Sequence, residues 1–238
     1  MRLDQYLVEY GYSQSRNKAQ ELIKKGLVRV DGEIIRKTSL DVQERQDIVV
    51  EEAKQYVSRA GDKLAGFLEN GTYAIVGKNC LDIGSSTGGF VEVLLSHGAA
   101  SVTAVDVGTD QLHERLRGDA RINLFEQTDI RSFTCNEPFA VVTCDVSFIG
   151  ITEMLSVLDP FVGDVIILLF KPQFEVGKDV KRSSKGVVKD DAAIERAKAR
   201  LETTAYTLGW ELLESKDSIV KGKEGNAETF YAFKKRRD

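Results

Sequence analysis

Histidine and cysteine are scarce in this 238-residue sequence. The two histidines, His97 and His113, are too few to supply a metal cluster. The three cysteines, Cys80, Cys135 and Cys144, are odd in number and lack C-x-x-C spacing. This pattern argues against a disulfide framework and against a zinc site. We therefore expect a protein without a bound metal.

Long apolar runs are missing as well. The longest, at residues 165–170, has the length of a buried strand, whereas a membrane span needs ~18 apolar residues. The acid at Asp4 stands where the apolar core of a signal peptide would begin. The sequence thus predicts a cytoplasmic globular protein with no membrane span, and we expect a monomer.

Positive charge is in deficit overall but is concentrated in three places. The net charge of −4, taken alone, argues weakly against a nucleic-acid partner. Residues 1–37, however, hold eight basic and five acidic side chains, residues 171–189 hold six and two, and residues 234–237 are all basic. One such run is usually a solvated face, but three on an acidic chain indicate contact with nucleic acid.

The first part of the chain, residues 1–50, predicts two helices and a small sheet. Residues 2–10 form the first helix, and a second begins after a cap at Ser13 or Ser15 and ends at Gly26. Asp31-Gly32 between two apolar runs predicts a two-residue hairpin, and residues 48–50 a further strand. Basic side chains on the second helix and the next strand can follow a phosphate backbone, or can simply pack on a neighbouring domain.

Three motifs in this segment are Arg2-Leu3-Asp4-x-x-Leu7, Ser15-Arg16-x-x-Ala19-x-x-Leu22-Ile23-x-x-Gly26 and Val28-x-Val30-Asp31-Gly32. With them the segment resembles the ribosomal-protein-S-four-type RNA-binding domain. The resemblance implies that residues 1–57 bind structured RNA. Together with the second basic run, the expected RNA-binding residues are Arg2, Arg16, Lys18, Lys24, Lys25, Arg29, Lys181 and Arg182.

A polar connector at residues 51–57 leads to a second domain, residues 58–238, in which strands and helices alternate. The expected strands are residues 80–83, 102–106, 122–125, 139–145, 164–170, 211–215 and 228–233. The expected helices are residues 62–70, 89–96, 109–116, 151–158 and 190–207. This alternation predicts an α/β, Rossmann-like domain with a mostly parallel seven-stranded sheet.

A glycine-rich turn follows the first of these strands, in Asp82-Ile83-Gly84-Ser85-Ser86-Thr87-Gly88-Gly89-Phe90. The dinucleotide fingerprint would have a second glycine where Ser86 stands, and here an acid precedes the turn. The pattern suits a ligand that has no phosphate but carries an amine and a cationic centre, and S-adenosylmethionine is such a ligand. The alternative is a glycine-lined turn without a ligand. The expected cofactor-binding residues of this stretch are Asp82, Gly84, Ser85, Thr87, Gly88, Gly89 and Phe90.

Polar residues also end the other predicted strands. Asp106 can accept hydrogen bonds from both ribose hydroxyls, and Asp129 can accept one from an adenine amino group. Asp145 and Lys171 end the next two strands. A single acid at a strand end is as readily a helix cap as a ligand. Since ligands of open α/β sheets bind beyond the carboxyl ends of the strands, the series predicts a pocket for S-adenosylmethionine.

The segment after the fourth strand narrows the reaction. Methylation of exocyclic amines usually goes with a proline-containing loop here, and Cys144-Asp145-Val146-Ser147-Phe148 has no proline. Pyrimidine C5 methylation needs a cysteine nucleophile, but no proline precedes Cys144 and no second cysteine is evident as its partner, so we interpret it as a small buried residue. Methylation of an oxygen remains, and a ribose 2′-hydroxyl requires a base.

Two lysines and two acids can meet that requirement. A lysine acts as a base when burial and a neighbouring cation favour loss of its proton. We assign Lys171 as the general base, with Asp145 and Glu228 orienting it and Lys63 positioning the ribose or its phosphate. The alternative is a pair of surface salt bridges.

Five motifs extend over the whole chain: Ser58-Arg59-Ala60-Gly61-Asp62-Lys63-Leu64, the glycine-rich stretch, Cys144 to Phe148, Lys171-Pro172-Gln173-Phe174-Glu175 and Gly225-Asn226-Ala227-Glu228. With them the chain resembles the TlyA family, once named as haemolysins and understood as ribosomal RNA 2′-O-methyltransferases related to the FtsJ group. The resemblance implies a class I methyltransferase fold and a catalytic tetrad of Lys63, Asp145, Lys171 and Glu228. It also implies methylation of a cytidine in ribosomal RNA at the subunit interface.

Two details qualify the resemblance. Ser218-Ile219-Val220 lacks the proline expected in that segment, near the loop that carries Glu228. The chain starts almost directly on the RNA-binding module, like the shorter family members that act on large-subunit RNA. Two other functions stay open, a membrane-lytic haemolysin and a catalytically inactive RNA-binding factor of ribosome assembly. No strongly amphipathic cationic helix supports lysis, and the intact series of strand-end residues argues against inactivity.

Overall fold

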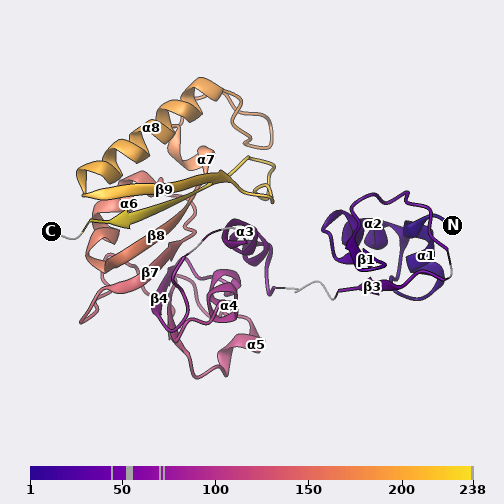
Figure 1. Cartoon of the computed structure of the whole chain (residues 1–238). Coiled ribbons are helices and arrows are strands. Elements are labelled where there is room, and N and C mark those ends of the chain that lie inside the picture. Colours follow the sequence, from indigo (N-terminus) through magenta and orange to yellow (C-terminus); the bar gives the residue numbers. More distant parts are fainter. Residues whose placement is uncertain (44, 52–55, 70, 72, 237–238) are drawn as a thin grey trace. The chain divides into compact units, whose positions relative to one another are not determined.

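The computed structural model describes residues 1–43, 45–51, 56–69, 71 and 73–236, and it divides into two compact units, residues 1–55 and 56–238 (Figure 1). Most of the predicted connector at residues 51–57 lies outside the described residues. So do Asn70, at the end of a predicted helix, and Arg237 in the basic tail.

The first unit contains two helices, α1 (Leu3–Glu9) and α2 (Arg16–Lys24), and a sheet in the order β2 (Glu33–Ile34), β1 (Val28–Val30), β3 (Ile48–Val50). The hydroxyl of Ser15 accepts a hydrogen bond from the Lys18 backbone N–H, so Ser15 rather than Ser13 caps α2. The apolar faces of both helices and the sheet share one small core, formed by Leu3, Tyr6, Leu7, Ala19, Leu22, Ile23, Val28, Val30, Val42 and Ile48.

The turn between β1 and β2 has the predicted conformation. Asp31 has φ 52° and Gly32 has φ 84°, and Val30 pairs with Glu33 across the turn. Two positive φ angles are the requirement of a two-residue hairpin turn whose twist matches the strands, and aspartate and glycine are among the residues that adopt them readily.

The second unit is built on a seven-stranded sheet in the order β6-β5-β4-β7-β8-β10-β9. The strands are β4 (Asn79–Ile83), β5 (Ser101–Val105), β6 (Ile122–Phe125), β7 (Phe139–Cys144), β8 (Val162–Phe170), β9 (Trp210–Asp217) and β10 (Thr229–Lys235). The five from β6 to β8 are parallel, and β10 runs antiparallel to both β8 and β9. The mostly parallel seven-stranded sheet confirms the predicted fold class.

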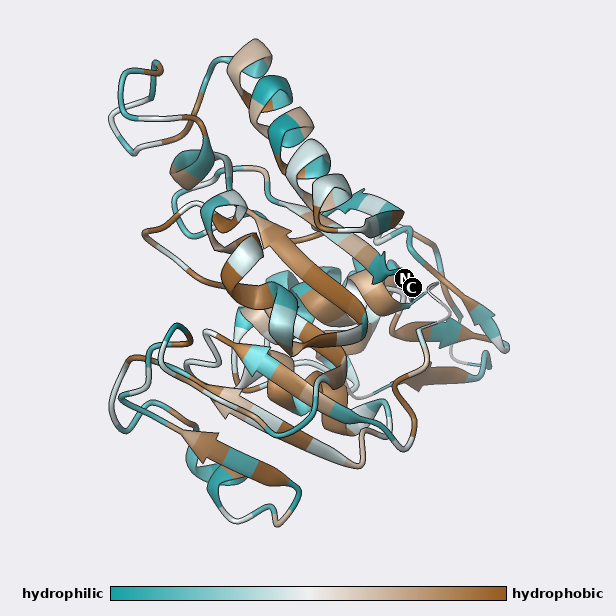
Figure 2. Ribbon diagram, turned by 90° about the vertical axis from the view of Figure 1, so that its left-hand side faces the viewer, coloured by the Kyte–Doolittle hydropathy of each residue, from teal (hydrophilic) through white to brown (hydrophobic). Residues whose placement is uncertain are grey.

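Helices cover both faces of this sheet. In β8, Ile166, Leu168 and Phe170 pack with α6 (Ile151–Leu158) and α8 (Asp191–Thr207). The intervening residues of the strand pack with α3 (Arg59–Leu68) and α4 (Gly89–Ser96). Because successive side chains of a strand point to opposite faces, a strand buried on both faces is apolar throughout. Figure 2 shows the contrast between brown central strands and the banded, amphipathic α8.

The predicted helix at residues 109–116 is wrong over most of its length. Only α5 (Glu114–Arg117) forms. Asp110 has φ 54°, and the backbone N–H groups of Asp110, Gln111 and Leu112 donate to the Glu126 carboxylate instead of to a helix. Two short elements were not predicted, the 3-10 helix η1 (Asp159–Phe161) and α7 (Pro172–Glu175).

Candidate active site

The carboxyl ends of β4 and β7 mark the point where the strand order reverses. From β4 the chain moves outward to β5 and β6, and then returns to the other side of β4 as β7. Neighbouring crossover connections leave this point in opposite directions, so a crevice opens there, where open α/β sheets bind their ligands.

The glycine turn after β4 lies tightly against the end of β7. Gly84 has φ 77°, and a Cβ atom there would lie 2.9 Å from the carbonyl oxygen of Asp145. Ser86 also has a positive φ of 45°, and its backbone N–H donates to Asp106 Oδ2 at 2.8 Å. Glycine at position 84 therefore lets two strand ends approach, and the carboxylate of Asp106 fixes the turn.

Gly88 and Gly89 serve the packing of α4. A Cβ atom on Gly88, whose φ is 91°, would lie 2.7 Å from Leu112 Cδ1. A Cβ atom on Gly89 would lie 2.7 Å from the Gly61 backbone nitrogen. Phe90 is buried in the core beneath α3 and α4. These three residues bring neighbouring segments close to the turn.

Asp82, the acid before the turn, is only 1 % exposed. The Thr143 hydroxyl donates to its Oδ1 at 2.7 Å, while Oδ2 has no hydrogen-bond partner among the described residues. Burial raises the pKa of this carboxyl to about 7. The Oγ atom of Ser85 is likewise buried without a partner in the described part of the chain. Buried polar atoms are normally satisfied, so these two indicate a ligand that brings hydrogen-bond donors, as the ammonium of an amino acid does.

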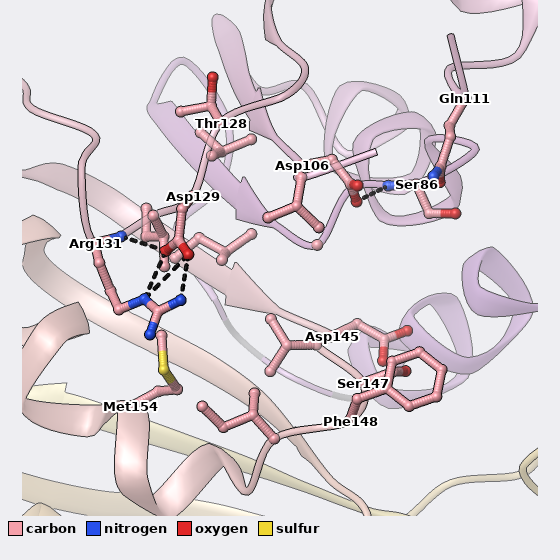
Figure 3. Close-up of a pocket in the computed structure, with 17 residues that line it drawn as sticks. Ser86, Asp106, Gln111, Thr128, Asp129, Arg131, Asp145, Ser147, Phe148 and Met154 are labelled. Carbon is pink, nitrogen blue, oxygen red and sulfur yellow. Dashed lines mark hydrogen bonds and ion pairs between the residues drawn. The ribbon is translucent and has the colours of Figure 1, made fainter. Parts of the chain in front are cut away.

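Three adjoining hollows open around the turn. The acidic hollow, about 470 Å³, is lined by Asp106, Asp129 and Asp145 together with apolar side chains such as Val107, Ile130 and Met154 (Figure 3). The central hollow, about 490 Å³, is lined by Asp82, Ser85 and Thr87 and by Lys63 and Lys171. The basic hollow, about 580 Å³, is lined by Arg59, Lys63, Lys171, Arg182, Lys185 and Lys223. Within the described residues, Ser147 lines all three.

Two carboxylates of the acidic hollow have partners from their own neighbourhood. Asp106 accepts backbone N–H groups from Ser86 and Gly108, at 2.8 and 2.7 Å. Asp129 forms an ion pair with Arg131, seen at the edge of the hollow in Figure 3, and the hydrogen bonds from Arg131 lower the pKa of that carboxyl to about 2. Asp106 is thus oriented at the hollow by two backbone donors, and Asp129 by the neighbouring Arg131.

The two predicted lysines and two predicted acids meet as two ion pairs. Lys63 Nζ lies 2.6 Å from Glu228 Oε2, and Lys171 Nζ lies 2.6 Å from Asp145 Oδ1. Lys171 also donates to Ser147 Oγ at 2.8 Å. The side chains of both lysines are 9 % exposed, so these are buried pairs rather than the surface salt bridges of the alternative interpretation.

Topology explains how residues from distant parts of the chain meet. Asp145 follows β7 and Lys171 follows β8, so two parallel strands deliver them to the same edge. Glu228 precedes β10, which is antiparallel to β8, and Thr229 pairs with Phe170. The start of β10 therefore lies at the same edge as the ends of the parallel strands. Lys63 comes from α3, which covers this side of the sheet.

The loop before Glu228 is closed by hydrogen bonds instead of the expected proline. The Ser218 hydroxyl donates to the carbonyl of Val220 at 2.8 Å, and the Ser218 backbone N–H donates to the carbonyl of Glu228 at 2.8 Å. The Gly222 N–H donates to the carbonyl of Asn226 at 2.9 Å. The loop is thereby tied on both sides of the carboxylate that receives Lys63.

In the first unit, Arg2 and Arg16 form ion pairs with the buried carboxylate of Asp4, and the hydrogen bond from Arg2 contributes most to lowering its pKa. Lys18 and Lys25 both pair with Glu21. Arg29 pairs with Glu51, and Lys24 is exposed on α2. The predicted cations thus lie on the surface of the unit, most of them oriented by an acid.

The other two predicted RNA-binding residues differ from each other. Lys181 is exposed, whereas Arg182 lines the basic hollow and donates to the carbonyls of Gln173 and Gly177 at 3.2 and 2.7 Å. Sequence reasoning did not assign Ser147, Arg59, Lys185 or Lys223 to the site. Ser147 stands two residues after Asp145, where side chains on a strand-end loop can return to the same edge, and this spacing was the signal that could have identified it.

Across the described residues, no group of histidine, cysteine and carboxylate side chains is arranged to hold a metal ion, and no helix is both long and apolar enough to cross a membrane. The strand order, the glycine turn and the strand-end pocket together define a Rossmann-like, class I methyltransferase fold.

Comparison with known proteins narrows this class. Residues 56–235 match the model of the FtsJ-like methyltransferase family, and residues 1–49 match the S4 domain. The 23S rRNA (cytidine-2′-O)-methyltransferase TlyA of Campylobacter jejuni is 46 % identical, over 98 % of this chain and 99 % of its own length. The 16S/23S rRNA (cytidine-2′-O)-methyltransferase TlyA of Mycobacterium tuberculosis is 40 % identical, over 96 % and 88 %. A crystal structure from Lactococcus lactis, assigned as a hemolysin, is 35 % identical and has a TM-score of 0.72 over 77 % of this chain and 90 % of that one.

The chain belongs to the FtsJ-like methyltransferases and, within them, to the TlyA family. It is therefore an S-adenosylmethionine-dependent enzyme that carries an S4 domain. The unpartnered oxygens of Asp82 and Ser85 fit the amino-acid end of that cofactor.

Proposed function

We propose that this protein methylates the 2′-hydroxyl of a cytidine in ribosomal RNA, with large-subunit RNA as its substrate. The observation that carries the proposal is the convergence of Lys63, Asp145, Lys171 and Glu228, from four separate elements, beside the glycine turn. The names of the relatives support the choice of a cytidine, and the C. jejuni relative supports the large subunit.

The cofactor would occupy the acidic and central hollows. S-adenosylmethionine supplies a methyl group bound to a sulfonium. After transfer of the methyl group, the sulfur is left as a neutral thioether. Asp82 and Ser85 would receive its ammonium, Asp106 the ribose hydroxyls and Asp129 the adenine amino group. Gly84, Thr87 and Phe90 line the central hollow, and Gly88 and Gly89 let neighbouring segments pack close to the turn.

Lys171 would act as the general base. A protonated lysine has three N–H donors and the neutral amine has two. Nζ of Lys171 donates one hydrogen bond to Ser147 Oγ at 2.8 Å, and Asp145 Oδ1 lies 2.6 Å from Nζ as its ion-pair partner. The hydrogen bond to Ser147 would orient the amine, and Asp145 would stabilise the ammonium that forms when Lys171 takes the proton of the 2′-hydroxyl.

The atoms balance in a single transfer. Lys171 would accept the hydroxyl proton as the ribose oxygen takes the methyl group, which the bound cofactor would supply from its sulfonium. The positive charge therefore moves from the sulfonium to the Lys171 ammonium, which Asp145 stabilises. Lys63 stays charged beside Glu228 and positions the ribose or its phosphate.

The two units would have different functions, RNA binding and methyl transfer. Residues 1–57 would hold structured RNA through Arg2, Arg16, Lys18, Lys24, Lys25 and Arg29. Residues 58–238 would perform the transfer, and Arg182 at the basic hollow and the exposed Lys181 next to it in the chain would contact the RNA backbone near the target. The first unit supplies affinity for RNA and the second supplies the chemistry.

The test is incubation with methyl-labelled S-adenosylmethionine and purified large or small ribosomal subunits, followed by mass spectrometry of the nucleosides and mapping of the modified position. We expect 2′-O-methylcytidine in large-subunit RNA, and its loss in Lys171→Ala. Lys171→Arg keeps the charge but cannot give up its proton, so it should be equally inactive. A methyl group on the base would contradict the proposal.

A further inference from the structure

The loops that carry the proposed base and its carboxylate partner are joined at two separate points. At the first, Lys171 contacts Asp145 and Ser147. The second lies four residues further along the chain, at Glu175 in α7, and takes no part in the proposed proton transfer. It connects the segment after β8 to the start of α6.

Glu175 closes this second junction with both carboxylate oxygens. One accepts the backbone N–H of Ile151, the first residue of α6, and the other accepts the Thr152 hydroxyl at 2.8 Å. The first N–H groups of a helix have no partner within the helix, so Glu175 caps α6 from another element. Arg200 of α8 supports the cap, with its guanidinium 3.9 Å from the same carboxylate and 3.3 Å from the Glu175 carbonyl.

Capping a helix with a buried carboxylate carries an unfavourable desolvation free energy. Glu175 is 6 % exposed, and burial raises the pKa of its carboxyl. An apolar contact would join two helices at less cost, but without fixing direction. Two hydrogen bonds from adjacent residues of α6 define both the distance and the orientation between the helices.

The chain is tightly packed between the two junctions. A Cβ atom on Gly150, just before α6, would lie 3.1 Å from the Phe174 carbonyl and 3.2 Å from Glu175 Oε2. The loop that carries Asp145 and Ser147 therefore ends, at Gly150, in close contact with α7. A shift of α7 relative to α6 would move Lys171 away from its two acceptors.

We infer that Glu175 is a positioning residue, which holds Lys171 in register with Asp145 and Ser147 for methyl transfer. This inference rests on the proposed function. It predicts that loss of the Glu175 carboxylate slows the chemical step and leaves cofactor binding intact, because the acidic and central hollows are lined by other residues.

The test compares Glu175→Ala and Glu175→Gln with the wild type. For the alanine variant we expect kcat to fall about 100-fold, the effect of a misplacement of about 1 Å, with KM for S-adenosylmethionine within about twofold, since Glu175 lines neither the acidic nor the central hollow. Glutamine keeps an acceptor for Ile151 and an amide that can donate to Thr152, so it should recover most of kcat.

Asp190→Ala is the matched control. Asp190 caps α8 through the Ala193 N–H at 2.8 Å, so its loss removes a helix cap of the same kind far from Lys171 in the chain. The control should lose stability but retain kcat. If Glu175→Ala does not fold, Thr152→Val tests the same junction and should lower kcat several-fold, as expected for one of two bonds.

The inference is wrong if Glu175→Ala retains kcat, if glutamine fails to restore it, or if Asp190→Ala loses as much activity per folded molecule. With Thr152→Val as the substitute, unchanged kcat has the same meaning. A wild-type protein that binds S-adenosylmethionine but methylates no ribosomal RNA would instead overturn the proposed function.

Discussion

Replacement of Asp82 by asparagine should change how the stability of the protein depends on pH. In the folded protein the pKa of this carboxyl is about 7, against an ordinary value of 3.8. Burial is the main cause, and the nearby carboxylates of Asp145 and Asp106 add to it. Between these two pKa values, the folded chain holds a proton that the unfolded chain has lost.

The sign follows from that difference. A group whose pKa is higher in the folded state favours folding fully below pH 3.8, and this contribution is lost as the pH rises through about 7. A gap of roughly three pH units at about 1.4 kcal/mol each gives about 4 kcal/mol. Asparagine does not titrate, and its unpartnered amide nitrogen costs about 1–3 kcal/mol at every pH.

Urea unfolding of both proteins at pH 5 and pH 8, without cofactor, measures the effect. On going to pH 8, the wild type should lose more stability than Asp82→Asn, by about 2.5–3 kcal/mol, because about two of the three pH units lie between pH 5 and the folded pKa of about 7. All other carboxylates are common to the two proteins and cancel in the comparison. Equal losses in both proteins would refute the assignment of a raised pKa to Asp82, and with it the reasoning from its burial.

Three further substitutions test the site and the RNA-binding unit. Gly84→Ala places a Cβ atom 2.9 Å from the Asp145 carbonyl in a left-handed conformation, so it should lower the free energy of unfolding by about 1–3 kcal/mol in urea titrations, whereas Gly118→Ala, with open space around it, should not. Ser147→Ala removes one acceptor of the proposed base and should reduce kcat about tenfold with little change in KM for the cofactor; an unchanged kcat would argue against its orienting role. Arg16→Ala should weaken binding to ribosomal RNA and reduce the slope of log K against log salt by about one, and an unaltered slope would mean that Arg16 contacts no phosphate.

The fold was largely predictable because its signals are local. Asp31-Gly32 identified the hairpin, and the apolar run at residues 165–170 identified a strand buried on both faces. The helix at residues 109–116 failed because Glu126, in a later segment, takes the N–H groups of Asp110 and Gln111. An acceptor in a later segment cannot be recognised from the spacing of apolar residues within the predicted helix.

The site was predictable only in part, for a related reason. Acids at strand ends can be located from the pattern, since parallel strands deliver them to one edge. Lys63 and Glu228 are 165 positions apart, and no spacing rule connects them. The need for a base and the family resemblance grouped them, but with Glu228 assigned to Lys171, whereas in the structure it pairs with Lys63. Neither spacing nor resemblance assigned Glu175 a task, because its partners are a backbone N–H and a hydroxyl of another helix.

The reversed direction of β10 has a consequence for how the enzyme comes into being. The ribosome completes the other six strands of the sheet before β10 is made, and Glu228 arrives with it. Until then the Lys63 ammonium has no Glu228 carboxylate to pair with, so a nascent or truncated chain that lacks this strand has an unbalanced charge at the proposed site. Assembly of the proposed catalytic group is thereby coupled to completion of the sheet.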